Sequence, residues 1–238
     1  MGVDIAAINM EWLIDFTIKN IKDLSGDYIC VSNVHTTVMA HENEEYCSIQ
    51  NGGIMAVPDG GPLSSVGRKR GYVNMSRTTG PDYLSKILSI SKDKGYRHYF
   101  FGSSEDTLNK LCDNVKQNYP GVIVAGVYSP PFRPLTKEEN IKIIEEINNV
   151  KPDFIWVGLG APKQEMWMAE HQGQIHGLMV GVGAAFDYVA GNIKRAPNWM
   201  QEHNLEWAYR LLQDPRRLFM RYFVTNTKFI INAILFGR

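Results

Sequence analysis

The stretch Phe154-Ile-Trp-Val-Gly-Leu-Gly-Ala-Pro-Lys-Gln-Glu165 decides the fold of this chain. Its first five residues form an apolar run, typical of a strand buried on both faces, and a glycine-rich turn and a helix-like segment follow. The same alternation recurs along the chain and predicts an α/β fold with a doubly wound, mainly parallel sheet. The expected strands are residues 28–32, 54–58, 98–101, 122–125, 154–158 and 178–181, and a capping box from Thr136 to Glu139 opens a helix expected over 136–149.

Composition bounds the class of protein. The 238 residues suffice for one α/β domain with an appendage, and 25 Lys and Arg balance 25 Asp and Glu. Without a net charge we expect no nucleic-acid partner, and any attraction to phosphate must be local. The three cysteines contain no C-x-x-C pair, which argues against a disulfide framework or a zinc site and favours a reducing compartment. We also expect no signal peptide, because no basic segment followed by an apolar run opens the sequence.

Polar or glycine-rich segments follow five of the expected strands. In a doubly wound sheet, ligands bind beyond the carboxyl ends of the strands, so we expect these exits to converge on one rim. At the third exit, Gly102 is a candidate for contacting substrate. The five exits are residues 33–37, 58–62, 102–104, 158–165 and 181–187.

Asp59 stands between Pro58 and Gly60 at the end of an expected strand, where its carboxylate would be held at the rim with little freedom. That placement suits a general base. An Asp here is also typical of an Asp-Gly turn, or of the N-cap of a helix beginning near Pro62. We interpret Asp59 as the catalytic base because the neighbouring exits are polar too.

The exit of the first strand carries Asn33, His35, Thr36 and Thr37, whose amide, imidazole and hydroxyl groups suit hydrogen bonding to sugar hydroxyls. A helix N-cap is an equally natural role for Asn33 or Thr36. His35 and His41 lack the spacing of a helical metal-binding pair, so we expect neither to bind a metal.

The glycines and Pro162 in residues 158–165 predict a strand-to-helix turn whose free N–H groups and positive helix end face the crevice. Such a turn binds phosphate, and we expect Lys163, Gln164 and Glu165 to contact the ligand. The alternative is that these three residues are solvated members of a first helical turn. Neither G-x-G-x-x-G nor a P-loop motif is present.

The chain changes character at about residue 205, beyond which it holds six basic residues, two acidic ones and many aromatics. We therefore expect a domain over residues 1–204 and a helical, basic-amphipathic appendage over 205–238. Pro215 predicts the start of a helix near Arg216, and helical spacing puts Arg217, Arg221, Thr225, Lys228 and Asn232 in one polar stripe. The apolar remainder, which includes Phe236, favours a helix lying in a membrane interface rather than spanning it. Packing on the α/β body or on an oligomer partner is the alternative.

In combination, these motifs resemble the WecG/TagA/CpsF glycosyltransferases, family 26 of the sequence-based classification. The resemblance spans nearly the whole chain, and the order and spacing of the motifs make it specific. The carriers are Asn33-Val-His-Thr, Pro58-Asp-Gly, Arg77-Thr-Thr-Gly-Pro-Asp82, Phe101-Gly102, Gly158-Leu-Gly-Ala-Pro-Lys-Gln-Glu165, Gly181-Val-Gly-Ala-Ala-Phe-Asp187, Arg195-Ala-Pro197 and Leu205-Glu-Trp-Ala-Tyr-Arg210.

The resemblance implies a Rossmann-like fold and an inverting, metal-independent transfer from a UDP-sugar to an undecaprenyl-diphosphate-linked sugar, in making teichoic acid or another surface polysaccharide. It assigns the base to Asp59 and places Asn33, Arg77, Gln164 and Asp187 among the family's functional positions. A catalytic Thr of the teichoic-acid branch is replaced here by Val31, and we expect Thr36 or Thr37 to substitute for it.

No two aspartates are separated by one residue, so the Asp-x-Asp pattern that holds a cation in many nucleotide-sugar transferases is absent. We expect neither a metal nor another cofactor. The charge of the diphosphate would then be met by arginines, which pair with phosphate in a bidentate manner, although an arginine-rich stretch is also typical of a solvated face. The candidates are Arg77, Arg195, Arg210, Arg216, Arg217 and Arg221.

The expected partners are a UDP-sugar donor, a lipid-diphosphate-linked sugar acceptor and the cytoplasmic membrane surface, with a homo-oligomer possible in addition. The protein is expected in the cytoplasm, peripheral at the inner face of the plasma membrane. One alternative is a non-catalytic module that senses a nucleotide sugar. An NAD-dependent oxidoreductase is disfavoured, because the first exit reads Ser-Asn-Val-His-Thr instead of a glycine-rich fingerprint.

Overall fold

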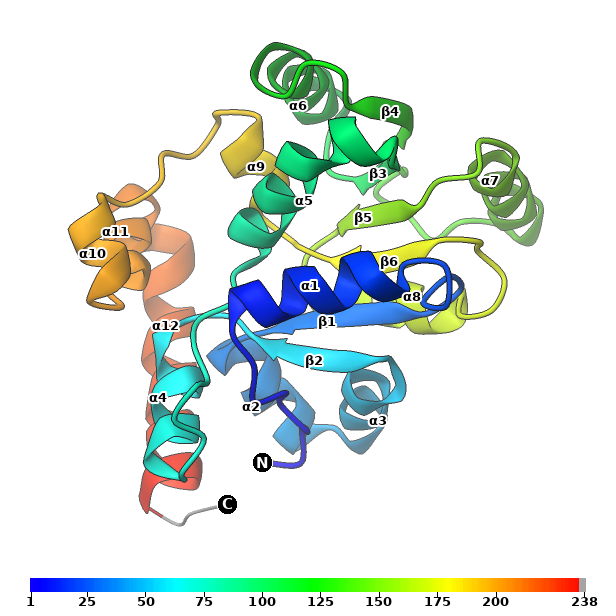
Figure 1. The fold of residues 1–238 in the computed structure, drawn as a ribbon. Helices are drawn as coiled ribbons and strands as arrows, with labels where there is room; N and C mark the ends of the chain where they lie inside the picture. Colours follow the sequence, from blue (N-terminus) through cyan, green and yellow to red (C-terminus); the bar gives the residue numbers. More distant parts are fainter. Residues whose placement is uncertain (236–238) are drawn as a thin grey trace.

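The computed structural model describes residues 1–235 and shows one wholly parallel sheet with strand order β2-β1-β6-β5-β3-β4 (Figure 1). All six expected strands are present, and the predicted Rossmann-like α/β class is confirmed. The strands are β1 (Tyr28–Ser32), β2 (Met55–Pro58), β3 (Arg97–Gly102), β4 (Ile123–Tyr128), β5 (Phe154–Gly158) and β6 (Leu178–Gly181).

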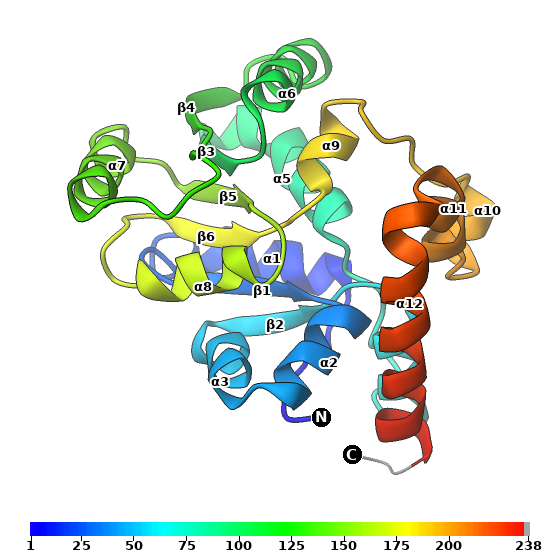
Figure 2. The ribbon, with the colours of Figure 1, turned by 180° about the vertical axis from the view of Figure 1, so that it is seen from behind.

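Helices cover both faces of the sheet (Figures 1 and 2). One face is packed by α1 (Met10–Asn20), α5 (Gly80–Lys94), α6 (Glu105–Asn118) and α9 (Ala185–Val189). The other face carries α3 (Glu44–Gly52), α7 (Lys137–Asn149) and α8 (Lys163–Glu170). Two further helices, α2 (Val34–Glu42) and α4 (Gly61–Lys69), follow β1 and β2 directly. The capping box of α7 is confirmed, because the Thr136 hydroxyl accepts from Glu139 N and the Glu139 carboxylate accepts from Thr136 N.

The two-sided cover explains why the strands read as continuous apolar runs. Along β3, Phe100 packs into the core on the α5 side, whereas Tyr99 and Phe101 pack into the core on the α7 side. Trp156 of β5 lies in the first core, and its neighbour Val157 lies in the second. Because successive side chains point to opposite faces and both faces are packed, most strand positions are apolar, and the buried His98 of β3 is hydrogen-bonded to Ser91 and Trp156.

The fourth strand corrects one expectation. It was expected to be buried over residues 122–125, but β4 spans Ile123–Tyr128 at the edge of the sheet, where it pairs with β3 alone. Ile123 and Val127 are 38% and 37% exposed. An apolar run therefore marks the strand but does not show that it is central.

The C-terminal part forms α10 (Asn198–Glu202), α11 (Glu206–Gln213), α12 (Pro215–Phe229) and a π-helical end, η1 (Ile230–Leu235). Pro215 is the first residue of α12 and Asp214 caps it, which confirms the predicted helix start. The helix α12 lies alongside α2, and the buried Phe229 packs with Val38 of α2 and Leu63 of α4 (Figure 2). Phe236, expected on the apolar face, lies outside the described residues.

Gly102 at the end of β3 is predicted to be required for the fold. Its φ of +114° disfavours L side chains, and a Cβ atom there would lie 2.7 Å from the carbonyl carbon of Gly158. We expect Gly102→Ala to lower the free energy of unfolding by about 2–4 kcal/mol, through backbone strain and steric conflict together. Chemical denaturation followed by circular dichroism measures this loss.

Gly71→Ala is the matched control, because Gly71 has a φ of +100° but no atom within 4 Å of the added Cβ. Its expected loss is about 1 kcal/mol, from conformation alone. Equal losses in the two variants would contradict the role of close packing at Gly102.

Candidate active site

A cavity of about 690 Å³ opens beyond the carboxyl ends of four strands. One side is formed by the residues that follow β1, β2, β5 and β6, including Asn33, Asp59 and Gln164. The opposite side is formed by α11 and α12, which contribute Arg210 and Arg221 among others. The site therefore lies between the sheet and the C-terminal helices.

Four of the five expected exits line this cavity, and the fifth does not. Gly102 is absent from the cavity wall, contrary to its predicted contact with substrate. The reason is strand order, since β3 lies on the far side of β5 from β1 and β6. Gly102 instead packs closely against Gly158.

Asp59 follows β2 on the cavity wall. Its backbone N–H donates to Ser32 O at 2.7 Å, which fixes the residue against the end of β1. Asn33 Nδ2 donates to its carboxylate at 3.5 Å. Burial raises the pKa of Asp59 to about 6, and the negative charge of Glu206 adds to this rise. The hydrogen bond from Asn33 and the charges of Arg77 and Arg210 act in the opposite direction.

The alternative role of Asp59 as a helix N-cap is not the one observed. Gly60 occupies the N-cap of α4, which has no side-chain capping bond. The carboxylate of Asp59 is thus left to face the cavity, and a pKa near 6 suits a proton acceptor at neutral pH.

Asn33 has a structural role in addition to its contact with Asp59. Its side-chain oxygen accepts from the backbone N–H groups of His35 and Thr36, and it forms a capping box with Thr36 at the start of α2. Because its oxygen is used by the helix, the amide nitrogen points toward Asp59. Asn33 therefore serves as the N-cap of α2 and as the hydrogen-bond donor to Asp59 at the same time.

The two threonines differ from the catalytic role expected of them. The hydroxyls of Thr36 and Thr37 both donate to the backbone oxygen of Asn33, and Thr36 also accepts from Asn33 N. Thr36 lines the cavity, but Thr37 does not. While these bonds hold, neither hydroxyl proton is free to reach a substrate.

The turn after β5 brings only one of its three predicted side chains to the cavity. Gln164 lines it, and its side-chain oxygen accepts from Gly160 N at 3.2 Å. Lys163 is exposed and lies outside the wall. Glu165 is fully buried outside the cavity wall, where it accepts from Gln164 Nε2 at 2.7 Å, and burial raises its pKa. We therefore assign Glu165 to the orientation of Gln164 rather than to the ligand.

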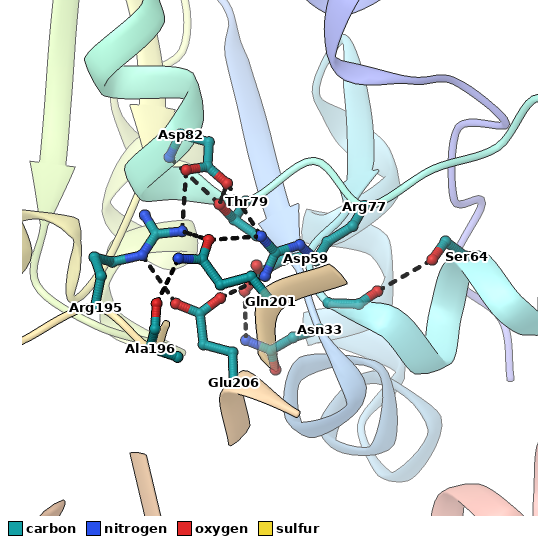
Figure 3. Close-up of polar contacts among 11 residues, drawn as sticks. Asn33, Asp59, Ser64, Arg77, Thr79, Asp82, Arg195, Ala196, Gln201 and Glu206 are labelled. Atoms are coloured by element: carbon teal, nitrogen blue, oxygen red, sulfur yellow. Dashed lines mark hydrogen bonds and ion pairs between the residues drawn. The ribbon is translucent and has the colours of Figure 1, made fainter. Parts of the chain in front are cut away.

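Arg77 and Arg195, which were expected to meet the charge of a diphosphate, are paired with carboxylates in the structure. Arg77 pairs with Glu206 and lies 3.4 Å from Asp82 (Figure 3). Arg195 lies 3.0 Å from Asp82 and 3.0 Å from Glu206, and both arginines donate to Gln201. Arg77 lines the cavity and Arg195 does not.

Three other predicted arginines form a positive wall. Arg210, Arg217 and Arg221 all line the cavity. Arg217 pairs with Asp214 at 2.6 Å, whereas Arg210 and Arg221 make no ion pair with a carboxylate of residues 1–232. Arg210 lies over the Tyr188 ring and Arg221 over the Tyr222 ring. Arg216 is exposed and lies outside the wall.

Several lining residues were not predicted. They include Tyr188, Trp207, Tyr222 and the carboxylate of Glu206. The segment from Leu205 to Arg210 carries two of them and was part of the recognised pattern, but nothing in it shows that Glu206 pairs with Arg77. The predicted Asp187 does line the cavity. His35 lines it too, and burial together with Arg221 lowers its pKa, so the imidazole is neutral at pH 7.

The helix α12 contributes both polar and apolar residues to its inner side. Arg217, Arg221 and Thr225 line the cavity, and Leu218 and Phe229 are buried. Phe219, Met220 and Phe223, in contrast, are 56%, 61% and 63% exposed. Of the expected stripe, Arg217, Arg221 and Thr225 line the cavity, whereas Lys228 pairs with Glu42 of α2 and, like Asn232, lies outside the wall.

No cluster of three or more His, Cys, Asp or Glu side chains in the described part of the chain is arranged to hold a metal ion. No helix within residues 1–235 has the length and apolar character needed to cross a bilayer.

Comparison with known proteins places the chain among transferases. The family described as "Glycosyl transferase WecG/TagA/CpsF family" matches residues 1–237. An N-acetylglucosaminyldiphosphoundecaprenol N-acetyl-beta-D-mannosaminyltransferase of Bacillus subtilis (strain 168) is 28% identical, covering 88% of this chain and 80% of that protein. Proteins of the same name from Bacillus spizizenii (strain ATCC 23059 / NRRL B-14472 / W23) and Staphylococcus aureus (strain MW2) are 30% and 26% identical, over 81% and 92% of this chain and 73% and 85% of theirs.

The raised pKa of Asp59 predicts a pH-dependent gain in stability for Asp59→Asn. Since the pKa in the folded protein is about 6 and the ordinary value is 3.8, protonation favours the folded state, and this contribution is lost as the pH rises through 6. The Asn variant carries no such loss. Above pH 7 it should therefore be more stable by about 1–2 kcal/mol, a figure discounted for the carboxylate surface open to the cavity.

Urea unfolding of both proteins from pH 3 to pH 8 measures the difference. The two curves should converge toward pH 3, where the carboxyl group is mostly protonated in both states. A constant offset at every pH would contradict the raised pKa.

Proposed function

Because the chain belongs to the WecG/TagA/CpsF family and is a glycosyltransferase, we propose that it moves N-acetylmannosamine or a related hexose from a UDP-sugar to an undecaprenyl-diphosphate-linked sugar. The names of the relatives give N-acetylmannosamine as the transferred group and a GlcNAc-diphosphoundecaprenol acceptor. The step belongs to the synthesis of teichoic acid or a similar surface polysaccharide.

One observation carries the proposal. A carboxylate with a pKa near 6 and a set of arginines face each other across one cavity, on separate parts of the fold. A glycosyl transfer needs both, since a proton leaves the acceptor hydroxyl while negative charge accumulates on the departing diphosphate.

Asp59 is proposed as the general base. It takes the proton of the acceptor hydroxyl while that oxygen forms a bond to the anomeric carbon. The bond from the anomeric carbon to the diphosphate oxygen breaks on the opposite face, so the configuration inverts. Asn33 holds the carboxylate through the same amide whose oxygen caps α2.

Arg210, Arg217 and Arg221 are proposed to bind the diphosphate of the leaving nucleotide. Guanidinium groups pair with phosphate in a bidentate manner, and donors fixed in advance cost no reorganisation during the reaction. We propose that transfer needs no metal.

The family favours this catalytic role over a module that only senses a nucleotide sugar, because the matched relatives bear the names of transferases. The two functions also differ in outcome. A sensor binds the UDP-sugar and leaves it intact, whereas the enzyme converts it.

We propose further that the protein is peripheral at the cytoplasmic leaflet, where a lipid-linked acceptor is presented. The exposed aromatic and aliphatic side chains of α12 form the docking face. Basic residues near such a face add about 1 kcal/mol each at an anionic surface. The competing occupant of the same face is a second copy of this chain.

The first prediction here concerns turnover. Asp59→Asn keeps the shape of the side chain but cannot take the proton, so it should retain UDP binding and lose about 10²–10⁴-fold in turnover. Wild-type turnover should also rise with pH through about 6, as Asp59 ionises. The measurement is mass analysis of product from UDP-N-acetylmannosamine and a soluble lipid-diphosphate-N-acetylglucosamine analogue, with and without EDTA.

Three results would count against this proposal. Nucleotide binding without any product favours the sensor, and activity of Asp59→Asn within a few-fold of wild type rejects the base. Loss of activity in EDTA that Mg²⁺ or Mn²⁺ restores rejects transfer without a metal.

The second prediction concerns the docking face. Replacing Phe219 and Phe223 together by Asp should abolish flotation with phosphatidylglycerol vesicles, because both side chains are exposed and neither lines the cavity. Transfer to the soluble acceptor analogue should stay near wild type. Phe132→Asp is the control, since Phe132 is fully exposed in the segment between β4 and α7.

Unchanged flotation of the double variant would show that the face does not dock on lipid. Sedimentation of the wild type and the double variant then decides for the second copy, if only the wild type forms a dimer.

A further inference from the structure

Four charged side chains join the C-terminal helices to the sheet domain. Arg77 precedes α5 and Asp82 lies in its first turn, whereas Arg195 lies between α9 and α10 and Glu206 is the first residue of α11. Each arginine contacts both carboxylates, so the four charges balance within one closed set (Figure 3). Glu206 is the only C-terminal carboxylate in this set, and its side chain is 19% exposed.

The side chain of Asn204, two residues before Glu206, contacts the segment that follows Asp59. A Cβ atom on Gly61 would lie 2.2 Å from the side chain of Asn204, so the turn before α11 approaches the start of α4 as closely as a glycine permits. Gly61 is two residues beyond Asp59. The α10–α11 turn therefore contacts the sheet domain both at the charged set and at the loop of the proposed base.

Glu206 also stands one turn before Arg210 on α11. Residues four apart lie on the same face of a helix, so the pairing of Glu206 with Arg77 and Arg195 fixes the side of α11 from which Arg210 reaches the cavity. Both Glu206 and Arg210 line the cavity.

We propose that Glu206 is the positioning residue of this enzyme: by pairing with Arg77 and Arg195 it holds α11 closed over Asp59 and aims Arg210 at the leaving diphosphate. It acts through these arginines and does not touch the reacting atoms. Arg77 and Arg195 accordingly hold α11 in place through Glu206. The diphosphate is bound by Arg210, Arg217 and Arg221. The inference rests on the proposed function for its catalytic consequence, but the closure itself does not depend on it.

Hydrogen exchange tests the closure without any substrate. Glu206→Gln leaves two arginines sharing one carboxylate, so amides of residues 206–213 should exchange about tenfold faster or more, while those of β1 and β5 stay protected. Glu206→Asp keeps the charge and should recover part of the protection. Glu202→Gln is the control, because Glu202 is exposed on α10 and makes the same change of charge.

Kinetics test the positioning. In Glu206→Gln, kcat should fall roughly tenfold to 10²-fold through misplacement of Arg210, with partial rescue in Glu206→Asp. The pH profile should move as well. Asn33, Glu206, Arg77 and Arg210 are the groups that act on Asp59, and Glu206 is the negative one, so its removal lowers the pKa of Asp59. The acid limb of kcat therefore moves to lower pH, which a loss of folded protein would not produce.

The outcomes distinguish failure of the proposed function from failure of the role of Glu206. If the wild type transfers no sugar, the proposed function fails, and exchange alone decides the closure. If Glu206→Gln exchanges and reacts like Glu202→Gln, the inference is overturned. If exchange rises but kcat and its acid limb do not change, the contact is structural and the positioning role is overturned.

Discussion

A parallel sheet that is covered by helices on both faces can bind a ligand only at the ends of its strands. The arrangement of the rest of this molecule follows from that constraint. Because β1 lies between β2 and β6, the segments carrying Asn33, Asp59 and Asp187 emerge side by side. The sheet supplies one wall of the cavity. The C-terminal helices α11 and α12 pack against the sheet domain and supply the other wall. The charges are divided in the same way, with the base on the sheet side and the arginine wall on the helices.

The features that depend on local sequence were predictable. Six apolar runs identified six strands, and a lone aspartate after a strand identified the residue that now faces the cavity. Features that depend on which segments meet were not. Strand order removes Gly102 from the site, and the edge position of β4 leaves it exposed. Arg77 pairs with the nearby Asp82, but its other partners, Gln201 and Glu206, come from more than a hundred residues away, so no local pattern shows that it is held by the C-terminal helices.

Hydrogen-bond competition explains the remaining difference. A hydroxyl near a helix start is drawn to the backbone, and Thr36 and Thr37 both follow this tendency at α2. Periodicity likewise divided α12 into a polar and an apolar face, but it contains no information about which face meets the protein. In the structure the cavity is lined by Arg217, Arg221 and Thr225, while Phe219 and Phe223 are exposed on the outer side.

That arrangement makes one helix both a cavity wall and an outer surface. An α-helix with its side chains is about 10–12 Å across. If the outer face of α12 rests on the leaflet, the headgroup region and the reacting atoms are separated by roughly that one thickness. A sugar carried on a diphosphate can then enter past the edge of the helix while its prenyl chain stays in the bilayer. The thickness of α12 would in this way set the minimum length of the acceptor: a polar part long enough to reach Asp59 would be accepted, and a shorter one would not.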